Sequence, residues 1–370
     1  MVPMTEGRAP RRGVAALVLG LAGVLVFLVL CETVILRWVL EPGDVPRNAW
    51  IDGMIRLEPN QTGLFRLRDE SAARYRINAQ GWNSGQGDYT LARIAGRARI
   101  AIIGDSFVEA LQVPATDSLA EQLQRRLEPA TAEVYRFGVS GAPLSHYLFM
   151  LEREVVDYAP DLVVLVLVHD DFEKSLRFTA GGSGSSFMQL ALADGRVIGE
   201  RAPEPYRPSI WDRIRSTATM RYLHSRQGLA PDGLTEPVPD ADVDARTVPA
   251  GLEEVRTATD HLFGRLAALC GDRGIRLLLL MDGDRRALDR PAAAEPGVAP
   301  TLNGLARELA ARHHIPFIDL GPRFAAARRQ AGERLDFPGD GHWKRRGHAV
   351  AAGAVAEFLR ADARLAARLR

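Results

Sequence analysis

Two short blocks, far apart in the chain, contain the side chains of a nucleophilic catalyst. Ser106, in the sequence Gly-Asp-Ser, follows the apolar run of residues 100–103 and precedes a helical pattern. A serine between a strand and a helix holds its hydroxyl clear of the sheet, and its N–H lies at the positive end of the helix dipole. Near the C-terminus, Asp340 and His342 precede an alanine-rich helical pattern. These residues predict a serine nucleophile, a histidine base and a carboxylate that orients the histidine.

Each block also has a simpler interpretation. Gly-Asp-Ser is an ordinary helix start, in which Asp105 or Ser106 caps the first turn. A single histidine at a helix start, such as His342, is commonly a cap or a surface residue. The prediction therefore depends on the pair of blocks rather than on either block alone.

Four blocks together resemble the GDSL, or SGNH, hydrolase superfamily. Ser106 matches the family's nucleophile. The second block, residues 137–142, contains Gly141, which matches the glycine whose backbone N–H points into the oxyanion hole. The third, residues 168–172, stands where the family writes Gly-x-Asn-Asp, and the fourth contains the histidine. The resemblance implies an ester hydrolase or acyltransferase that requires no metal or other cofactor.

The third block departs from the family pattern, because Asp170 stands where the oxyanion-hole asparagine is expected. An ionised carboxylate would repel the developing oxyanion, so Asp170 donates only if burial or its neighbour Asp171 keeps it protonated. Otherwise the hole consists of the N–H groups of Ser106 and Gly141, or His169 takes the role. Loss of one donor typically lowers the rate by about 10²–10³.

The fourth block departs in its spacing. The commonest family spacing places the acid three residues before the histidine, where this chain has Gly339. Asp340 lies two residues before, in a form that resembles the Asp-x-His-Trp block of membrane-anchored and sugar-acetylating relatives. Triads are recognised by geometry and not by spacing. Asp340 is therefore the predicted acid, and Asp336 is the weaker substitute.

Alternating sequence patterns predict an α/β fold. Apolar, partly β-branched runs occur at residues 100–103, 134–137, 162–168, 275–281 and 315–320. Helical patterns occur at 107–127 (with a break at 113–114), 144–158, 252–272, 302–313 and 344–369. This alternation predicts a three-layer α/β/α domain with a parallel sheet, and the resemblance implies a flavodoxin-like version of it. Ser106, Gly141 and Asp170 all follow predicted strand ends, where sites form in such sheets.

The N-terminal segment predicts a membrane anchor. Residues 13–31 carry no charge, and about 20 apolar residues are enough to cross a bilayer as a helix. Arg8, Arg11 and Arg12 precede the run, which predicts a cytoplasmic N-terminus and a translocated, periplasmic domain on a bacterial-type inner membrane. A cleaved signal peptide is the alternative, but no small-x-small site ends the apolar run.

The chain divides into three predicted parts. Residues 1–40 form the tip and anchor, 41–95 a small β-rich segment, and 96–370 the hydrolase domain. An insertion at about 179–250 interrupts the domain, with loop-like ends and a helical pattern at 209–225. It predicts either a lid or substrate wall, or a packing elaboration without substrate contact.

Composition excludes other classes of protein. The net charge is +1, and no basic stripe with interleaved aromatic residues is present, which argues against a dedicated nucleic-acid binder. Cys31 and Cys270 are the two cysteines, one in the apolar run and one in a helical pattern, so no intramolecular disulfide is expected.

The sequence thus predicts a serine-dependent esterase or O-acyltransferase that acts on an extracytoplasmic O-acylated substrate, such as a cell-surface glycan or lipid. One alternative, favoured by Asp170, is a catalytically silent member that binds glycan or scaffolds an envelope assembly. The other is a divalent-metal hydrolase. Its ligands would come from His169, Asp170, Asp171, Asp340, His342 and His348. The acyl group, the acceptor and the oligomeric state are not readable from the residues.

Overall fold

A five-stranded parallel sheet forms the centre of the protein. The computed structural model describes residues 10–67, 70–127, 132–176, 184–225, 251–285 and 298–369. The sheet has the order β11-β10-β7-β5-β6, and all of its pairings are parallel. Its strands are β5 (Ala98–Gly104), β6 (Ala132–Gly138), β7 (Leu162–Leu167), β10 (Arg276–Met281) and β11 (Phe317–Asp319). The five predicted strands are thereby confirmed, in the flavodoxin-like order 2-1-3-4-5.

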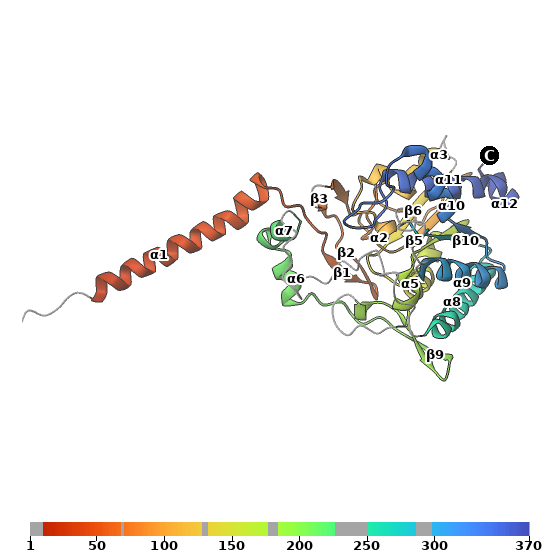
Figure 1. Cartoon of the computed structure of the whole chain (residues 1–370), viewed down its shortest axis with the longest axis horizontal. Helices are drawn as coiled ribbons and strands as arrows, with labels where there is room; N and C mark the ends of the chain where they lie inside the picture. The colour runs from red at the N-terminus through yellow and green to blue at the C-terminus, as the bar shows by residue number, and fades with distance from the viewer. Residues whose placement is uncertain are drawn as a thin grey trace, which may run out of the picture.

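Helices cover both faces of this sheet, which gives the predicted three layers (Figure 1). Successive strand side chains point to opposite faces, so Ile103 and Ile102 enter two separate buried cores. The first core includes residues of α4 (Leu144–Arg153), α8 (Leu252–Asp272) and α9 (Val298–Arg312). The second includes residues of α3 (Leu119–Arg126), α10 (Gly321–Ala331) and α11 (Arg345–Ala361). Each core anchors the strand ends that carry the candidate site.

Two long helical patterns are each divided in the structure. The pattern at 107–127 gives α2 (Ser106–Glu109) and α3, separated by Ala110 in the left-handed conformation (φ +52°) and by the 3₁₀ turn η2 (Ala115–Asp117). The pattern at 344–369 gives α11 and α12 (Ala363–Arg368), because the side chain of Asp362 accepts hydrogen bonds from two N–H groups of α12 at 3.1 Å each. The pattern at 144–158 ends as a 3₁₀ turn, η3 (Val155–Tyr158).

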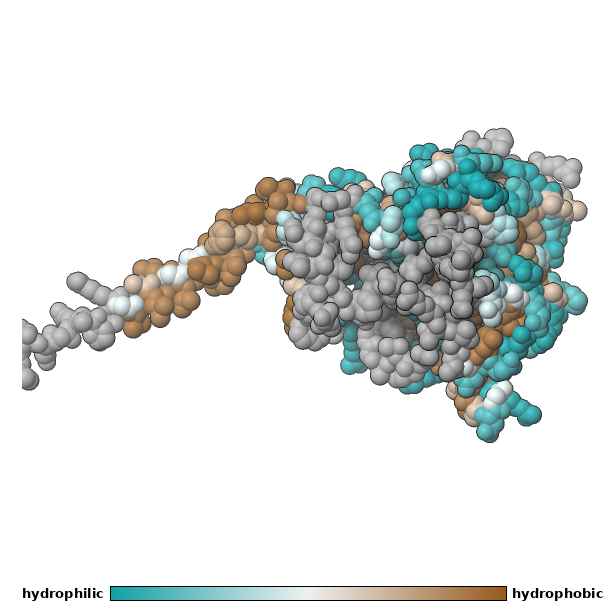
Figure 2. All heavy atoms as spheres, viewed as in Figure 1, coloured by the Kyte–Doolittle hydropathy of each residue, from teal (hydrophilic) through white to brown (hydrophobic). Residues whose placement is uncertain are grey.

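The N-terminal apolar segment is a helix that projects from the rest of the protein. It consists of α1 (Pro10–Leu30), continued by the π-helical η1 (Cys31–Val39). Residues Gly13–Val39 have the length and composition of a membrane span. Their most apolar stretch of 18 residues has a mean hydropathy of 3.0 and is not buried inside the protein. A signal sequence would have the same properties. Figure 2 shows the helix as a hydrophobic rod beside a largely hydrophilic body.

The segment between this helix and the sheet contains two antiparallel hairpins. They are β1 (Asn48–Ile51) with β2 (Met54–Leu57), and β3 (Thr62–Leu67) with β4 (Ser71–Arg76). Met54 and Trp82 share the first core with strand residues, and the indole of Trp82 donates a hydrogen bond to Glu154 at 3.0 Å. The segment therefore packs firmly on the main domain.

The insertion contains one element that the sequence did not predict. After α5 (Asp170–Lys174) and the short turn η4 (Gly184–Ser186), the chain forms the hairpin of β8 (Gln189–Ala193) and β9 (Arg196–Arg201). The predicted helical stretch follows as α6 (Ile210–Arg215) and α7 (Ala218–Ser225). Residues 181–183 of the predicted loop at 181–186, and all of the proline-rich tract at 231–249, lie outside the described residues.

Candidate active site

Ser106 is the first residue of α2, immediately beyond the carboxyl end of β5. Asp105 caps the helix, because its carboxylate accepts a hydrogen bond from the N–H of Phe107 at 3.0 Å. The helix lies directly on the end of β6, where a Cβ atom on Gly138 would come within 2.1 Å of the backbone nitrogen of Glu109. Only glycine at that position lets α2, and with it Ser106, approach the sheet this closely.

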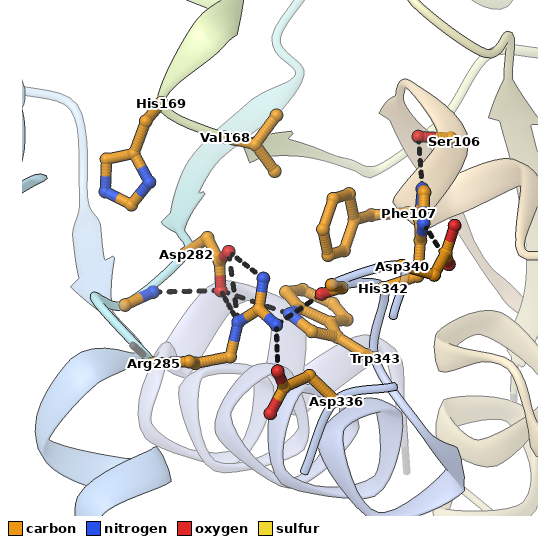
Figure 3. A network of polar contacts seen from close by, with 12 residues as sticks. Ser106, Phe107, Val168, His169, Asp282, Arg285, Asp336, Asp340, His342 and Trp343 are labelled. Carbon is orange, nitrogen blue, oxygen red and sulfur yellow. Dashed lines mark hydrogen bonds and ion pairs between the residues drawn. The ribbon is translucent and has the colours of Figure 1, made fainter. Parts of the chain in front are cut away.

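Ser106, His342 and Asp340 form a continuous chain of hydrogen bonds. The Oγ of Ser106 lies 2.7 Å from Nε2 of His342, and Nδ1 of His342 lies 2.6 Å from Oδ2 of Asp340 (Figure 3). A carboxylate at Nδ1 holds the imidazole proton there, which leaves Nε2 to accept from the hydroxyl. The His342 and Asp340 side chains are both buried. The structure thus brings the three predicted residues together in the order a nucleophilic serine requires.

The surroundings of His342 favour its protonated form. Burial alone would lower the pKa of its imidazole, but the adjacent carboxylates of Asp340 and Asp105 outweigh that effect, so the pKa lies above the ordinary value. An imidazolium formed by proton transfer from a serine would be stabilised by the same carboxylates. The ring also packs against Phe107, with 4.7 Å between the ring centroids.

Gly141 lies in the turn between β6 and α4, with a φ of +77° that favours glycine. The turn is joined to the end of β5, because the N–H of Val139 donates to the carbonyl of Gly104 at 3.2 Å. The nearest atom to a Cβ built on Gly141 would be a ring carbon of Phe187, at 3.9 Å. Gly141, the predicted oxyanion-hole glycine, thus lies in a turn that is joined to the end of β5, next to Ser106. Its backbone has a positive φ, which glycine adopts readily.

Asp170 begins α5 and its carboxylate pairs with the ammonium group of Lys174, one turn later. Carboxylate oxygens of Asp105, Asp170 and Asp171 all lie within 4.8 Å of one another. Burial, and then the charge of Asp170, raises the pKa of Asp105 to about 6. Burial likewise raises the pKa of Asp171, with further contributions from Asp105 and Asp170. The position that the family fills with asparagine is therefore part of a buried group of acids, in which Asp105 and Asp171 favour their protonated forms.

Asp171 has a structural role within this group. Its carboxylate accepts hydrogen bonds from the N–H of Val168 at 2.8 Å and from the hydroxyl of Tyr147 at 3.0 Å. These contacts fix the turn that follows β7. Lys174 remains a cation, because the attraction of Asp170 outweighs the burial that would lower the pKa of its ammonium group.

His169 faces away from Ser106. Its Nε2 lies 2.8 Å from Oδ1 of Asn303, and Figure 3 shows its ring well apart from the Ser106–His342 pair. The structure therefore does not place His169 as an oxyanion donor. The six predicted metal ligands do not converge either, since Asp340 and His342 pair with each other. In the described chain, the acidic group of Asp105, Asp170 and Asp171 includes only two of them.

A buried ion pair that sequence reasoning missed supports the histidine block. Arg285 binds the carboxylate of Asp282 through Nη2 at 2.9 Å and donates through Nη1 to the carbonyl of Gly341 (Figure 3). The same carboxylate accepts from the indole of Trp343 at 3.1 Å. An aspartate at the end of β10 was visible in the sequence, but nothing there indicated that its partner would be Arg285.

Asp336, the weaker substitute for the triad acid, belongs to this ion-pair network. Its carboxylate lies 2.7 Å from Nη2 of Arg334 and 3.7 Å from Nη1 of Arg285. Asp340 is the carboxylate that contacts His342. The structure therefore places Asp340, and not Asp336, in the position of an acid that orients His342.

The fold and these contacts define an α/β protein with a serine, a histidine and an aspartate joined at the carboxyl ends of the strands. Residues 102–350 match the model of the GDSL-like Lipase/Acylhydrolase family, and the chain belongs to that family. Its reaction class is therefore ester hydrolysis.

The comparison with solved structures gives many matches of low identity. A structure titled TesA is 15% identical, with a TM-score of 0.39, over 71% of this chain and 98% of that one. The acetyl xylan esterase AlAXEase is 14% identical, with a TM-score of 0.38, over 70% and 99%. A lipase/acylhydrolase from Enterococcus faecalis is 17% identical, with a TM-score of 0.37, over 71% and 95%. No curated protein matches the chain.

Proposed function

We propose that this protein is a membrane-anchored esterase whose nucleophile is Ser106. The serine oxygen attacks the acyl carbonyl of an ester while Nε2 of His342 takes its proton, and Asp340 holds the imidazole in the required tautomer. The N–H groups of Ser106 and Gly141 stabilise the oxyanion. His342 then donates the proton to the leaving alcohol, which leaves an acyl group on Ser106.

One observation supports this proposal most strongly. The 2.7 Å contact between Ser106 and His342 and the 2.6 Å contact between His342 and Asp340 connect residues from two ends of the domain. A helix cap needs neither a base nor an orienting acid. The simpler interpretation, in which Ser106 only starts α2, leaves this buried chain of contacts unexplained.

The acyl-enzyme has two fates. Attack by water, activated by His342, completes a hydrolysis, and attack by a sugar hydroxyl completes an O-acyl transfer. The Ser106–His342–Asp340 contacts serve both outcomes, because the same base deprotonates either nucleophile. Product analysis with and without an added sugar acceptor distinguishes them.

The proposed location is the outer side of a bacterial-type cytoplasmic membrane. The uncharged residues 13–31 and the three preceding arginines support a single span with the catalytic domain translocated. At that location the substrate we propose is an O-acylated glycan or lipid of the cell surface. The protein needs no metal for this chemistry.

A fluorophosphonate probe tests the nucleophile directly. We expect the full chain in detergent to be labelled and to hydrolyse p-nitrophenyl acetate. The Ser106→Ala and His342→Ala variants should lose both properties, because the probe requires an activated serine. Ser140→Ala is the matched control, since this serine is also near the site but its hydroxyl donates to Glu109. It should be labelled like the unmodified protein.

Two results would contradict the proposal. Labelling that persists in Ser106→Ala would place the nucleophile elsewhere. A folded but unlabelled and inactive protein would favour the silent, glycan-binding alternative, for which the replacement of asparagine by Asp170 is the motivating observation.

A further inference from the structure

The inserted helix α7 is held by the end of the apolar N-terminal helix. The carboxylate of Glu32, in η1, accepts hydrogen bonds from the N–H of Ala218 at 2.5 Å and from the N–H of Thr219 at 3.0 Å. It also accepts from the hydroxyl of Thr219 at 2.9 Å. Glu32 thus caps α7 from a position 186 residues earlier in the chain. Close beside it, the guanidinium of Arg221 pairs with Asp44.

This cap fixes the depth of α7 relative to a bilayer. Residues 13–31 are uncharged and long enough to fill the hydrocarbon layer, and Glu32 is the first charged residue after them. Arg37 and Trp38 follow, and residues of these types gather at the membrane–water interface. When the helix spans the membrane, the N-terminus of α7 therefore lies at the level of the lipid headgroups.

The surface around this junction combines exposed apolar and basic side chains. Ile210, at the start of α6, is 64% exposed, and Figure 1 shows α6 and α7 beside the end of the projecting helix. The exposed apolar residues at the junction are Trp38, Val39, Val45 and Ile210. The exposed basic residues are Arg37, Arg207 and Arg213. Isolated apolar side chains are common on surfaces, but here they adjoin the span itself.

We propose that α6 and α7 form a docking surface for the headgroup layer of an anionic bilayer. Ile210 inserts at the boundary between headgroups and acyl chains, and the arginines contact lipid phosphates. This inference rests on the membrane anchoring proposed above. It adds a second, surface contact, so that the catalytic domain keeps a defined orientation instead of swivelling on a single helix.

The same insertion reaches the catalytic site at its other end. Phe187, shortly before β8, faces Gly141, and the carbonyl of Met188 accepts a hydrogen bond from Ser145 of α4 at 2.6 Å. One continuous described segment, residues 184–225, thus runs from the candidate oxyanion hole to the proposed membrane surface.

Spin labels at three exposed apolar positions test the docking surface in the full chain. In a Cys31→Ser, Cys270→Ala background, single cysteines replace Ile210, Ile198 and Leu25, which are 64%, 67% and 63% exposed. Ile198 is the matched control, because it lies in β9 of the same insertion, away from the projecting helix (Figure 1). Collision with oxygen and with a water-soluble nickel complex reports the depth of each label in nanodiscs.

In nanodiscs that contain phosphatidylglycerol, we expect the oxygen-to-nickel ratio at position 210 to exceed that at position 198 severalfold, with Leu25 higher still. In phosphatidylcholine alone, or at high salt, the ratio at 210 should fall because the arginine contacts weaken. In Glu32→Ala the ratio at 210 should fall toward that at 198, while the ratio at Leu25 stays unchanged.

Equal ratios at 210 and 198 with a lipid-buried Leu25 would overturn the docking surface and leave the anchor intact. A water-exposed Leu25 would overturn the anchor and the docking surface together. Neither result bears on the Ser106 chemistry, which is measured separately.

Discussion

The carboxylate of Asp282 accepts a hydrogen bond from the indole of Trp343 at 3.1 Å, which joins the end of β10 to the residue next to His342. Arg285 completes the connection, because it binds Asp282 and the carbonyl of Gly341, on the other side of His342. Both neighbours of the histidine are thus held by one buried ion pair. The imidazole is therefore positioned by this network as well as by Asp340.

Trp343→Phe removes the indole N–H and keeps an aromatic ring between Phe107 and Phe324. Loss of this hydrogen bond should lower kcat about fivefold with little change in KM, since one net hydrogen bond contributes about 1 kcal/mol. Steady-state kinetics on p-nitrophenyl acetate check it. Trp82→Phe is the control, because its indole bonds to Glu154 outside the site. It should lower Tm and leave kcat unchanged. An equal kcat loss in both variants would contradict a positioning role.

Asp340→Asn should lower kcat by about 10⁴, because the amide no longer favours the productive imidazole tautomer. Asp336→Asn should retain most of the activity, since Asp336 contacts arginines and not His342. The measurement is kcat/KM for both variants, with Tm as a test of folding. A larger activity loss in Asp336→Asn than in Asp340→Asn would show that the triad acid is misassigned.

Asp170→Asn should preserve or raise the activity if this position serves the oxyanion hole, because an amide N–H donates to the oxyanion without needing a proton. Asp171→Asn is the comparison. An amide offers one acceptor where Asp171 accepts from both Val168 and Tyr147, so this variant should lose stability. Both are assayed by kcat and Tm. A large kcat loss in a stable Asp170→Asn protein would mean that the carboxylate, paired with Lys174, has a function of its own.

Gly138→Ala should abolish activity or folding, because the added Cβ would collide with the backbone of α2 at 2.1 Å from the nitrogen of Glu109. Gly141→Ala should be milder, since the nearest atom would be 3.9 Å away and the cost is the positive φ of 77°, about 1–2 kcal/mol. Probe labelling and Tm of the two variants test the difference. Equal effects would show that close approach of α2 to β6 does not position Ser106.

The pH dependence of kcat/KM should show an acid limb whose midpoint lies above about pH 6.5, the ordinary pKa of histidine. His342 acts as a base only when neutral, and its pKa is raised because Asp340 and Asp105 outweigh the effect of burial. Activity is therefore complete above the raised pKa and falls as the pH decreases through it. In Asp340→Asn the limb should move to lower pH, since a cation-stabilising charge is lost. If the acid limb does not move in this variant, the limb reports the titration of a group other than His342.

The sequence was sufficient for the sheet, for the grouping of Ser106, His342 and Asp340, and for the projecting helix, because each has a local signal. Buried parallel strands are continuous apolar runs, and Ser106 and His342 each lie in a recognisable motif just before a helix. The support that the Asp282–Arg285 pair gives to the histidine block could not be predicted. That support depends on contacts with Trp343 and Gly341, which lie more than 55 positions away. The β8–β9 hairpin was missed for a different reason. Its strands are short, and exposed apolar residues such as Ala191 and Ile198 break the alternation of apolar and polar side chains.

The contact between Ser106 and His342 spans 236 positions of the chain. A ribosome that has already synthesised the serine must therefore add almost the whole remaining domain before that serine meets its base. Until then the hydroxyl is an ordinary alcohol. For the nucleophile that we propose, reactivity therefore depends on the completion of folding.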